Sequence, residues 1–206
     1  MKKFILLAVI ALAIGHQSLA QESASSEKLW NFGADANFYI FKDEFIFLPV
    51  FKADKNKLHL EARYNYEDLE TFSGWVGYNI SGGKKLEYMI TPMLGGVVGL
   101  TDGIATGLEF TLTYKSLEIY SESEYLFDMQ TNENNFFYMW TDFTYAPKDW
   151  LWLGLSGQRT RLYQTDLEIQ RGLLIGGALK NWELTGYLYN LGFDDPFVLL
   201  TLSLSF

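Results

Sequence analysis

Polar and apolar side chains alternate strictly along several long segments of this chain, and this feature limits its fold more than any other. Residues 57–67, KLHLEARYNYE, carry apolar side chains at every second position. Residues 197–206, FVLLTLSLSF, show a similar alternation up to the last residue. A period of two is typical of a β-strand with one apolar and one polar face, whereas a helix has a period of 3.6. The sequence therefore predicts an all-β protein.

Turn-forming residues divide the chain into twelve such segments, as expected for a meander of antiparallel hairpins. The connections form two alternating sets: one carries Lys, as in DKNK, and the other carries acids and Asn, as in DMQTNENN. Pro49 and Pro92 fall inside predicted strands, where a missing N–H removes a ladder hydrogen bond. Bulges or a strand break are expected there, and ten strands are the alternative count. The predicted strands span residues 29–41, 45–53, 57–67, 71–81, 85–98, 103–114, 117–127, 136–146, 150–162, 167–180, 182–191 and 197–206.

The first twenty residues have the features of a cleavable signal peptide. Lys2 and Lys3 precede an unbroken apolar run, and small residues end the segment at Ala20. The run is too short to span a bilayer as a helix, which needs roughly 20 residues. We therefore expect export with removal of residues 1–20, a short periplasmic segment at 21–28 and a β-barrel at 29–206.

Strand length and aromatic content separate a membrane barrel from a soluble barrel or sandwich, which is the competing architecture. Most predicted strands exceed the five or six residues usual in globular sheets and suit the roughly 9–11 residues of a tilted membrane-spanning strand. The chain contains 6 Trp, 13 Tyr and 16 Phe, many of them near predicted strand ends. Aromatic girdles of this kind are typical of a membrane–water boundary. The sequence thus favours an up-and-down transmembrane β-barrel.

The last predicted strand ends in an aromatic residue with apolar residues at alternate positions before it. Together with the signal peptide and the hairpin meander, this pattern resembles the bacterial outer-membrane β-barrel proteins, a broad class in which no specific family is identified. The resemblance implies location in the outer membrane, contact with outer-membrane lipid and lipopolysaccharide, and recognition by the barrel-assembly machinery. The residues that would carry the assembly signal are Val198, Leu200, Leu202, Leu204 and Phe206.

Composition argues against several classes of function. The chain has no Cys and two His, so disulfides, thiolate nucleophiles and cysteine-ligated metals are excluded, and no metal or cofactor is expected. A net charge of −9 argues against a nucleic-acid partner. A lipid-modifying barrel enzyme, a minor alternative, would need a His near the outer leaflet with a nucleophile in reach. His59 directly follows a Lys-bearing turn and faces the predicted lumen, so no catalytic residue is assigned.

The polar faces of the predicted strands would line the barrel lumen, where acids exceed bases. Uncompensated carboxylates in a narrow lumen attract cations, so we predict a narrow, weakly cation-favouring pore for ions or small cationic or neutral solutes. Two alternatives stay open: the charges neutralise one another across the lumen, or the barrel is a scaffold without transport. Aromatic residues at lumen positions predict a slim or partly occluded passage, and the short loops predict no infolded loop. The charged residues expected to line the lumen are Asp35, His59, Glu61, Arg63, Glu87, Glu109, Glu118, Glu122, Glu124, Asp142 and Glu168.

Three arginines occupy alternate strand positions that are expected to face lipid, close to the acidic connections. They are Arg159, Arg161 and Arg171. In the predicted hairpin Arg159 lies opposite Arg171, and like charges in that arrangement are destabilising unless an anion lies between them. One interpretation is a contact with lipopolysaccharide phosphates, which Arg binds in a bidentate manner. The other is that bulges at Gly157 and Gly172 turn the arginines inward to neutralise lumen acids.

Overall fold

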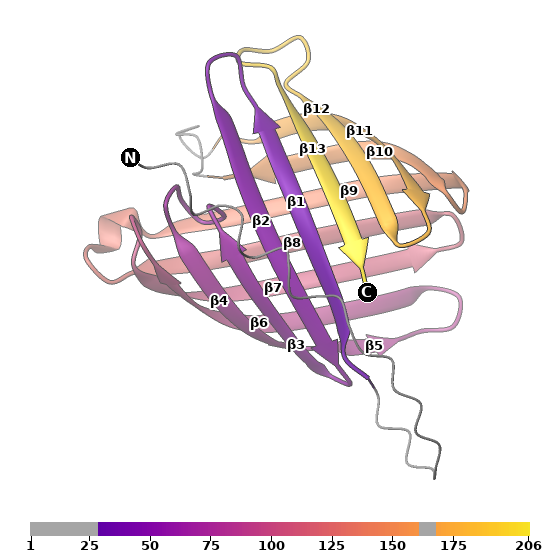
Figure 1. Cartoon of the computed structure of the whole chain (residues 1–206), viewed down its shortest axis with the longest axis horizontal. Coiled ribbons are helices and arrows are strands. Elements are labelled where there is room, and N and C mark those ends of the chain that lie inside the picture. Colours follow the sequence, from indigo (N-terminus) through magenta and orange to yellow (C-terminus); the bar gives the residue numbers. More distant parts are fainter. Residues whose placement is uncertain (1–28, 161–167) are drawn as a thin grey trace, which may run out of the picture.

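The structure is a closed antiparallel β-barrel (Figure 1). It is a computed structural model that describes residues 29–160 and 168–206. The predicted signal peptide, the segment 21–28 and Arg161 lie outside the described residues. Among the residues that are described, no helix has the length and apolar character needed to span a membrane. The elements are β1 (Asn31–Ile40), β2 (Phe45–Lys55), β3 (Leu58–Tyr64), β4 (Phe72–Tyr78), β5 (Ile80–Gly82), β6 (Glu87–Val98), β7 (Gly103–Tyr114), β8 (Leu117–Asp128), the 3₁₀ turn η1 (Asn132–Asn134), β9 (Phe136–Lys148), β10 (Leu151–Arg159), β11 (Gln170–Leu179), β12 (Trp182–Tyr189) and β13 (Phe197–Ser205).

The barrel has twelve strands, because β4 and β5 are two parts of one strand. Both pair with β6 in a single register, and the interruption at Asn79 lies beside Pro92 of β6. Pro92 has no N–H to donate across the ladder, which explains the break expected at this position. Pairing between β1 and β2 runs through Pro49 without a register shift, so no bulge forms there. The twelve predicted strands are confirmed, and the alternative of ten is wrong.

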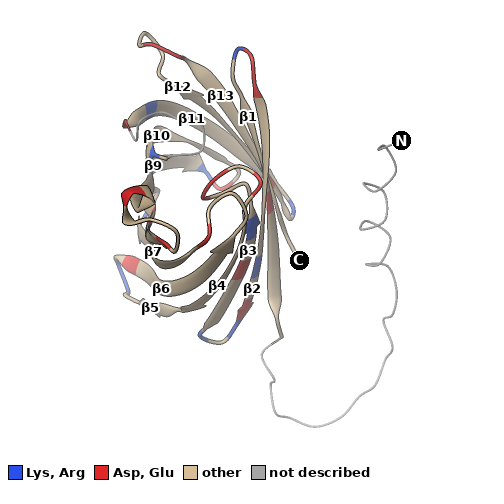
Figure 2. Cartoon of the chain, turned by 90° about the vertical axis from the view of Figure 1, so that its left-hand side faces the viewer, with Lys and Arg blue, Asp and Glu red and all other residues tan. Residues whose placement is uncertain are grey.

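Each strand pairs with its neighbours in sequence, which gives an up-and-down topology. β1 pairs with both β2 and β13, so the first and last strands close the barrel. Figure 2 shows the resulting ring of strands. A closed sheet has no free edge and satisfies its backbone hydrogen bonds internally, as a strand protein in lipid requires.

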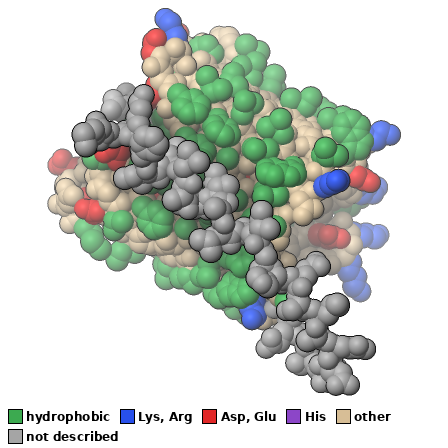
Figure 3. Space-filling model, in the orientation of Figure 1, with side chains coloured by type: hydrophobic (Ala, Val, Ile, Leu, Met, Phe, Trp, Pro, Cys, Tyr) green, Lys and Arg blue, Asp and Glu red, His purple; other side chains and the backbone are tan. Residues whose placement is uncertain are grey.

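The outer surface of the barrel is largely apolar. Leu94, Val98, Ile175 and Leu184 are each more than half exposed. In Figure 3 apolar side chains cover much of the visible face, and most charged side chains lie towards its margins. β6, β7 and β8 have 12 residues each, enough to cross a hydrocarbon layer when tilted. An exposed apolar band of this extent suits a membrane barrel rather than a soluble one.

The two ends of the barrel differ in their connections. At one end, named the turn end, tight turns join β2 to β3, β7 to β8 and β11 to β12, with positive φ values of 58°, 54° and 58° at Asn56, Lys115 and Lys180. The backbone N–H of Phe32 donates to the carbonyl of Phe206 there (2.9 Å), so the start of β1 and the end of the chain meet at this end. The acid-rich connections form the opposite end, named the loop end.

Candidate functional site

The middle of the lumen contains a cavity of about 160 Å³ lined by charged and aromatic side chains. Asp35 and Lys52 reach it from β1 and β2, Glu61 and Arg63 from β3, and Glu122 from β8. These strands lie on opposite sides of the ring, and alternation along each strand directs these side chains inward. The cavity is the candidate functional site.

Arg63 is the central cation of this site and is only 1% exposed. Its Nε donates to Glu61 Oε2 at 2.6 Å, and its Nη1 donates to Glu122 Oε1 at 2.7 Å and to Glu124 Oε2 at 3.3 Å. The guanidinium also lies over the ring of Trp75, 4.7 Å from its centroid. Arg63 therefore ties β3 to β8 across the lumen through a buried ion-pair cluster.

Lys52 and His59 supply two further basic groups. The Lys52 ammonium lies 3.7 Å from carboxylate oxygens of both Asp35 and Glu61, and 3.8 Å from Glu109. His59 lies between two carboxylates, with Nδ1 2.8 Å from Asp54 and Nε2 2.9 Å from Glu61. Part of this network therefore matches the alternative in which acidic and basic side chains neutralise one another across the lumen.

Carboxylates nevertheless outnumber bases in the interior. Among the described residues, Arg63 is the one Lys or Arg classed as buried. Some acids are held by neutral donors instead: Asp142 accepts hydrogen bonds from Trp140 Nε1 at 2.7 Å and from the Tyr187 hydroxyl at 3.0 Å. The buried acidic residues are Glu61, Glu67, Glu109, Glu122, Glu124, Asp128 and Asp142.

The connection between β3 and β4, residues 65–71, folds into the lumen and corrects the expectation that no loop does so. Tyr66 and Glu67 are 7% and 1% exposed. The Tyr66 hydroxyl donates to Glu122 at 2.7 Å and lies 2.9 Å from the Tyr138 hydroxyl of β9. This inward fold was not predicted, because the strand was expected to continue to residue 67, whereas β3 ends at Tyr64 and leaves a connection of seven residues, 65–71.

Glu67 is held inside the barrel by hydrogen bonds from Ser73 (2.5 Å) and Trp75 Nε1 (3.2 Å). Burial raises the pKa of the Glu67 carboxyl above its ordinary value, and the nearby Arg63 opposes this effect. Glu67 was placed at the end of the predicted strand 57–67 and was not named among the lumen residues; β3 ends at Tyr64, and Glu67 enters the lumen from the connection that follows.

Apolar and aromatic side chains fill the loop-end half of the lumen. Tyr39 is 3% exposed, and Leu126, Tyr189 and Leu199 are fully buried. The rings of Tyr189 and Phe197 stack with centroids 4.9 Å apart. The passage is therefore narrow at the loop end, while the cavity lies in the middle of the barrel.

The predicted lumen residues fall into three groups in the structure. Most contribute to the buried clusters described above, and Asp35 and Glu118 are half-buried on the wall. Glu87, at the start of β6, is exposed. The expectation for Glu168 needs correction: β11 begins at Gln170, so Glu168 lies beyond the strand and is exposed.

The arginines of β10 and β11 lie outside the lumen. Arg171 pairs with Gly157, not with Arg159, so the predicted opposition of the two arginines is wrong. The register between β10 and β11 is continuous, so the bulges that would have turned the arginines inward do not form. Arg171 is exposed and lies over the ring of Phe193, 5.6 Å from its centroid, and Arg159 donates to the carbonyl of Phe137. The prediction centred this hairpin on residue 165, whereas the register between β10 and β11 is centred on residue 164, which shifts every partner by two positions.

The similarity of this chain to known proteins lies in its three-dimensional fold. No protein-family model matches the chain, and no curated protein matches its sequence. The barrel is similar to the solved structure of the KdgM porin, with a TM-score of 0.60, 12% identity and coverage of 84% of this chain and 99% of that one. The chain has the fold of an outer-membrane porin.

Two further solved structures are similar to this chain. The KdgM porin in complex with disordered oligogalacturonate matches with a TM-score of 0.63, 12% identity and coverage of 84% of this chain and 99% of that one. The outer membrane protein Omp33 of Acinetobacter baumannii matches with a TM-score of 0.47, 11% identity and coverage of 86% and 97%.

Proposed function

We propose that this chain is an integral β-barrel of the bacterial outer membrane that forms a narrow, weakly cation-favouring pore for ions or small solutes. The porin fold and the apolar outer band support the location and the general role. The observation that carries the cation preference is the excess of buried carboxylates over buried bases in the lumen. Fixed negative charge in a confined passage raises the local concentration of cations and repels anions.

The turn-end half of the lumen carries acids that would act on entering ions. Asp35 and Glu118 lie close enough to Glu183 of β12 to interact with it electrostatically. Within residues 29–160 and 168–206, neither Glu118 nor Glu183 has an ion-pair partner, and Asp35 has only the Lys52 ammonium at 3.7 Å. These three acids, named the turn-end acids, are the proposed determinants of ion preference.

Neutralising the turn-end acids is expected to weaken the cation preference. In a planar bilayer with a salt gradient, the variant Asp35→Asn, Glu118→Gln, Glu183→Gln should shift the reversal potential towards zero, because it removes three of the fixed negative charges that favour cations while the buried carboxylates remain. Glu87→Gln, an exposed acid at the start of β6, is the matched control and should leave the reversal potential unchanged. An unchanged potential in the triple variant would contradict the assignment of these three residues.

The proposed solutes are small cations or small neutral molecules. One structure with the same fold is a complex with oligogalacturonate, a polymer whose sugar units carry carboxylates. Excess lumen acids would repel such a polyanion, so this ligand is not carried over to the present chain. His59 lies within an ion network on the lumen wall, and no enzymatic role is proposed.

We place the turn end in the periplasm and the loop end outside, with the terminal strand β13 read by the assembly machinery. This orientation rests on the resemblance of the last strand to outer-membrane assembly signals. The packed loop-end half of the lumen favours one alternative, a structural barrel without transport. Bilayer recordings separate the two roles, because a scaffold would show no channel events.

The outward-facing arginines form a proposed contact with lipopolysaccharide phosphate. Removing both, by Arg159→Ala with Arg171→Ala, should reduce the lipopolysaccharide that copurifies with the barrel, because each lost guanidinium removes charge-assisted hydrogen bonds to phosphate. Lys148→Ala with Lys180→Ala, at the turn end, provides a control of equal charge change. Altered ion preference with unchanged bound lipid would show that the arginines act on the lumen instead.

A further inference from the structure

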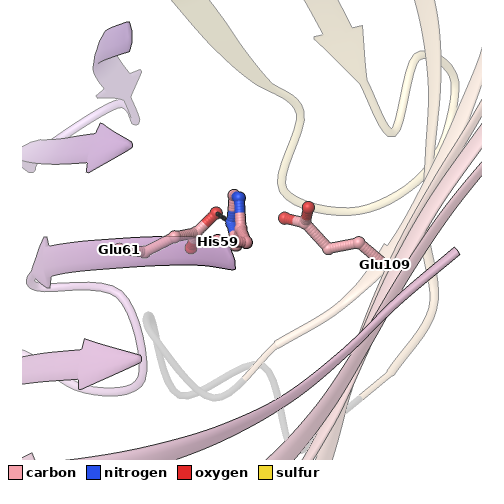
Figure 4. Close-up of side chains that lie close together, drawn as sticks. All are labelled: His59, Glu61 and Glu109. Atoms are coloured by element: carbon pink, nitrogen blue, oxygen red, sulfur yellow. Dashed lines mark hydrogen bonds and ion pairs between the residues drawn. The ribbon is translucent and has the colours of Figure 1, made fainter. Parts of the chain in front are cut away.

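Three potential metal ligands converge inside the barrel, in a group that the sequence did not predict. They are His59 and Glu61 of β3 and Glu109 of β7, and all three are at most 9% exposed. One ligand atom from each lies within 4.8 Å of the other two. Figure 4 shows His59 and Glu61 side by side and Glu109 pointing towards them from another strand. His59 and Glu61 share a face because they are two residues apart on one strand.

Each of these side chains is held in place by a second residue. Asp54 lies 2.8 Å from His59 Nδ1, which leaves Nε2 directed towards Glu61. Arg63 holds Glu61 through Oε2, at 2.6 Å from its Nε, which leaves Oε1 facing His59. Carboxylates behind imidazoles and hydrogen bonds behind carboxylates are the outer contacts that orient ligands in metal sites.

Further contacts support Asp54 and Glu109. Asn79 donates to Asp54 Oδ1 at 2.7 Å, and the Tyr120 hydroxyl donates to Glu109 Oε1 at 3.1 Å. These contacts orient the three potential ligands towards a common point.

A cationic group of the protein already lies at this point. The Lys52 ammonium is 3.7 Å from Glu61 Oε1 and 3.8 Å from Glu109 Oε1, beyond the usual length of a hydrogen bond. Its side chain is 29% exposed, and it also lies within 3.7 Å of Asp35. The ammonium can therefore move towards Asp35 and release the two glutamates, and the excess of nearby carboxylates favours a more highly charged cation in its place.

We infer that His59, Glu61 and Glu109 form a binding site for a divalent transition-metal ion in the lumen. The imidazole and carboxylate donors suit Zn²⁺ and Co²⁺ rather than Ca²⁺ or Mg²⁺, which prefer all-oxygen sites. Metal–ligand bonds of about 2.0–2.2 Å in a tetrahedral site place the ligand atoms roughly 3.4 Å apart. Atoms now up to 4.8 Å apart would have to approach by roughly 1.4 Å at most. His59 Nε2 and Glu61 Oε1, which are 2.9 Å apart, would separate slightly. The glutamate side chains can accommodate this movement. The site does not depend on conduction through the barrel.

The test uses the full-length barrel, purified in detergent without a polyhistidine tag. After equilibration with Zn²⁺ and removal of free ion, the wild type should retain a single Zn²⁺, and Co²⁺ should give the absorption bands of an ordered site. His59→Gln and Glu109→Gln should each weaken the affinity by about tenfold or more, because each removes a ligand. Lys52→Met should increase the affinity, since it removes the competing ammonium. Glu87→Gln, an exposed acid outside the site, should leave it unchanged.

Heat-dependent gel mobility establishes that each variant is folded, and Glu109→Gln decides the outcome if His59→Gln does not fold. Absence of Zn²⁺ retention by the folded wild type, or retention that folded His59→Gln and Glu109→Gln both preserve, would overturn the site. Weaker binding in Lys52→Met would also contradict it. These results are independent of channel recordings, so the metal site and the pore can fail separately.

Discussion

Replacing Arg63 by Met is expected to destabilise the folded barrel by about 3–5 kcal/mol, the usual cost of removing one partner from a buried ion pair. Arg63 is 1% exposed and contacts Glu61, Glu122 and Glu124. Without it these carboxylates lose their main compensating charge in a region that water barely reaches. The measurement is the urea dependence of unfolding in lipid vesicles, followed by heat-dependent gel mobility.

Two companion variants make this prediction specific. Arg63→Met combined with Glu122→Gln should recover part of the lost stability, because one uncompensated charge is removed with its partner. Lys52→Met should cost much less, since Lys52 is partly exposed and lies 3.7–3.8 Å from its carboxylates. Little or no loss of stability in Arg63→Met, no greater than that in Lys52→Met, would show that the buried cluster does not stabilise the barrel.

Replacing the inward-facing residues of the loop at 65–71 with Gly and Ser is expected to raise the single-channel conductance several-fold. Replacing residues 66–69 with an equal number of Gly and Ser residues removes the Tyr66 side chain, which contacts Glu122 and Tyr138, and the Leu69 side chain, which packs on the apolar cluster. Asn65 and Glu70, which have positive φ values of 57° and 51°, are retained so that the loop can still close. Single-channel recording in a planar bilayer gives the conductance.

The loop at residues 190–196 provides the matched control. Leu191 and Phe193 are exposed there, so a Gly and Ser replacement of residues 191–194 removes a similar number of side chains without opening the lumen. The conductance of this control should equal that of the wild type. Equal conductance in both loop variants would mean that the loop at 65–71 does not limit passage.

The strand pattern could be predicted from the sequence because lipid requires it. A strand whose outward face meets hydrocarbon must carry apolar residues at alternate positions, and β13 shows this from Val198 to Leu204. The same alternation placed Glu61, Arg63 and Glu122 on the inner face. Turn residues then fixed the strand limits to within a few positions, even beside Pro92.

Contacts between strands that are distant in the ring could not be predicted in this way. Alternation shows that Glu109 points inward, but not that the relative stagger of the strands brings it level with His59 and Glu61. The inward position of Tyr66 depends on the same stagger, since its partners lie on β8 and β9, whereas Glu67 is held by Ser73 and Trp75 of β4. For this reason the sequence predicted an acidic lumen but neither its infolded loop nor its potential metal ligands.

The most direct test of the proposed pore is the reversal potential of the wild-type barrel in a planar bilayer separating concentrated from dilute KCl. A lumen with excess buried carboxylates predicts small channel events whose current reverses at a potential displaced towards the equilibrium potential of K⁺. Displacement towards the equilibrium potential of Cl⁻, or a bilayer that stays silent although folded barrels are inserted, would contradict a cation-favouring pore.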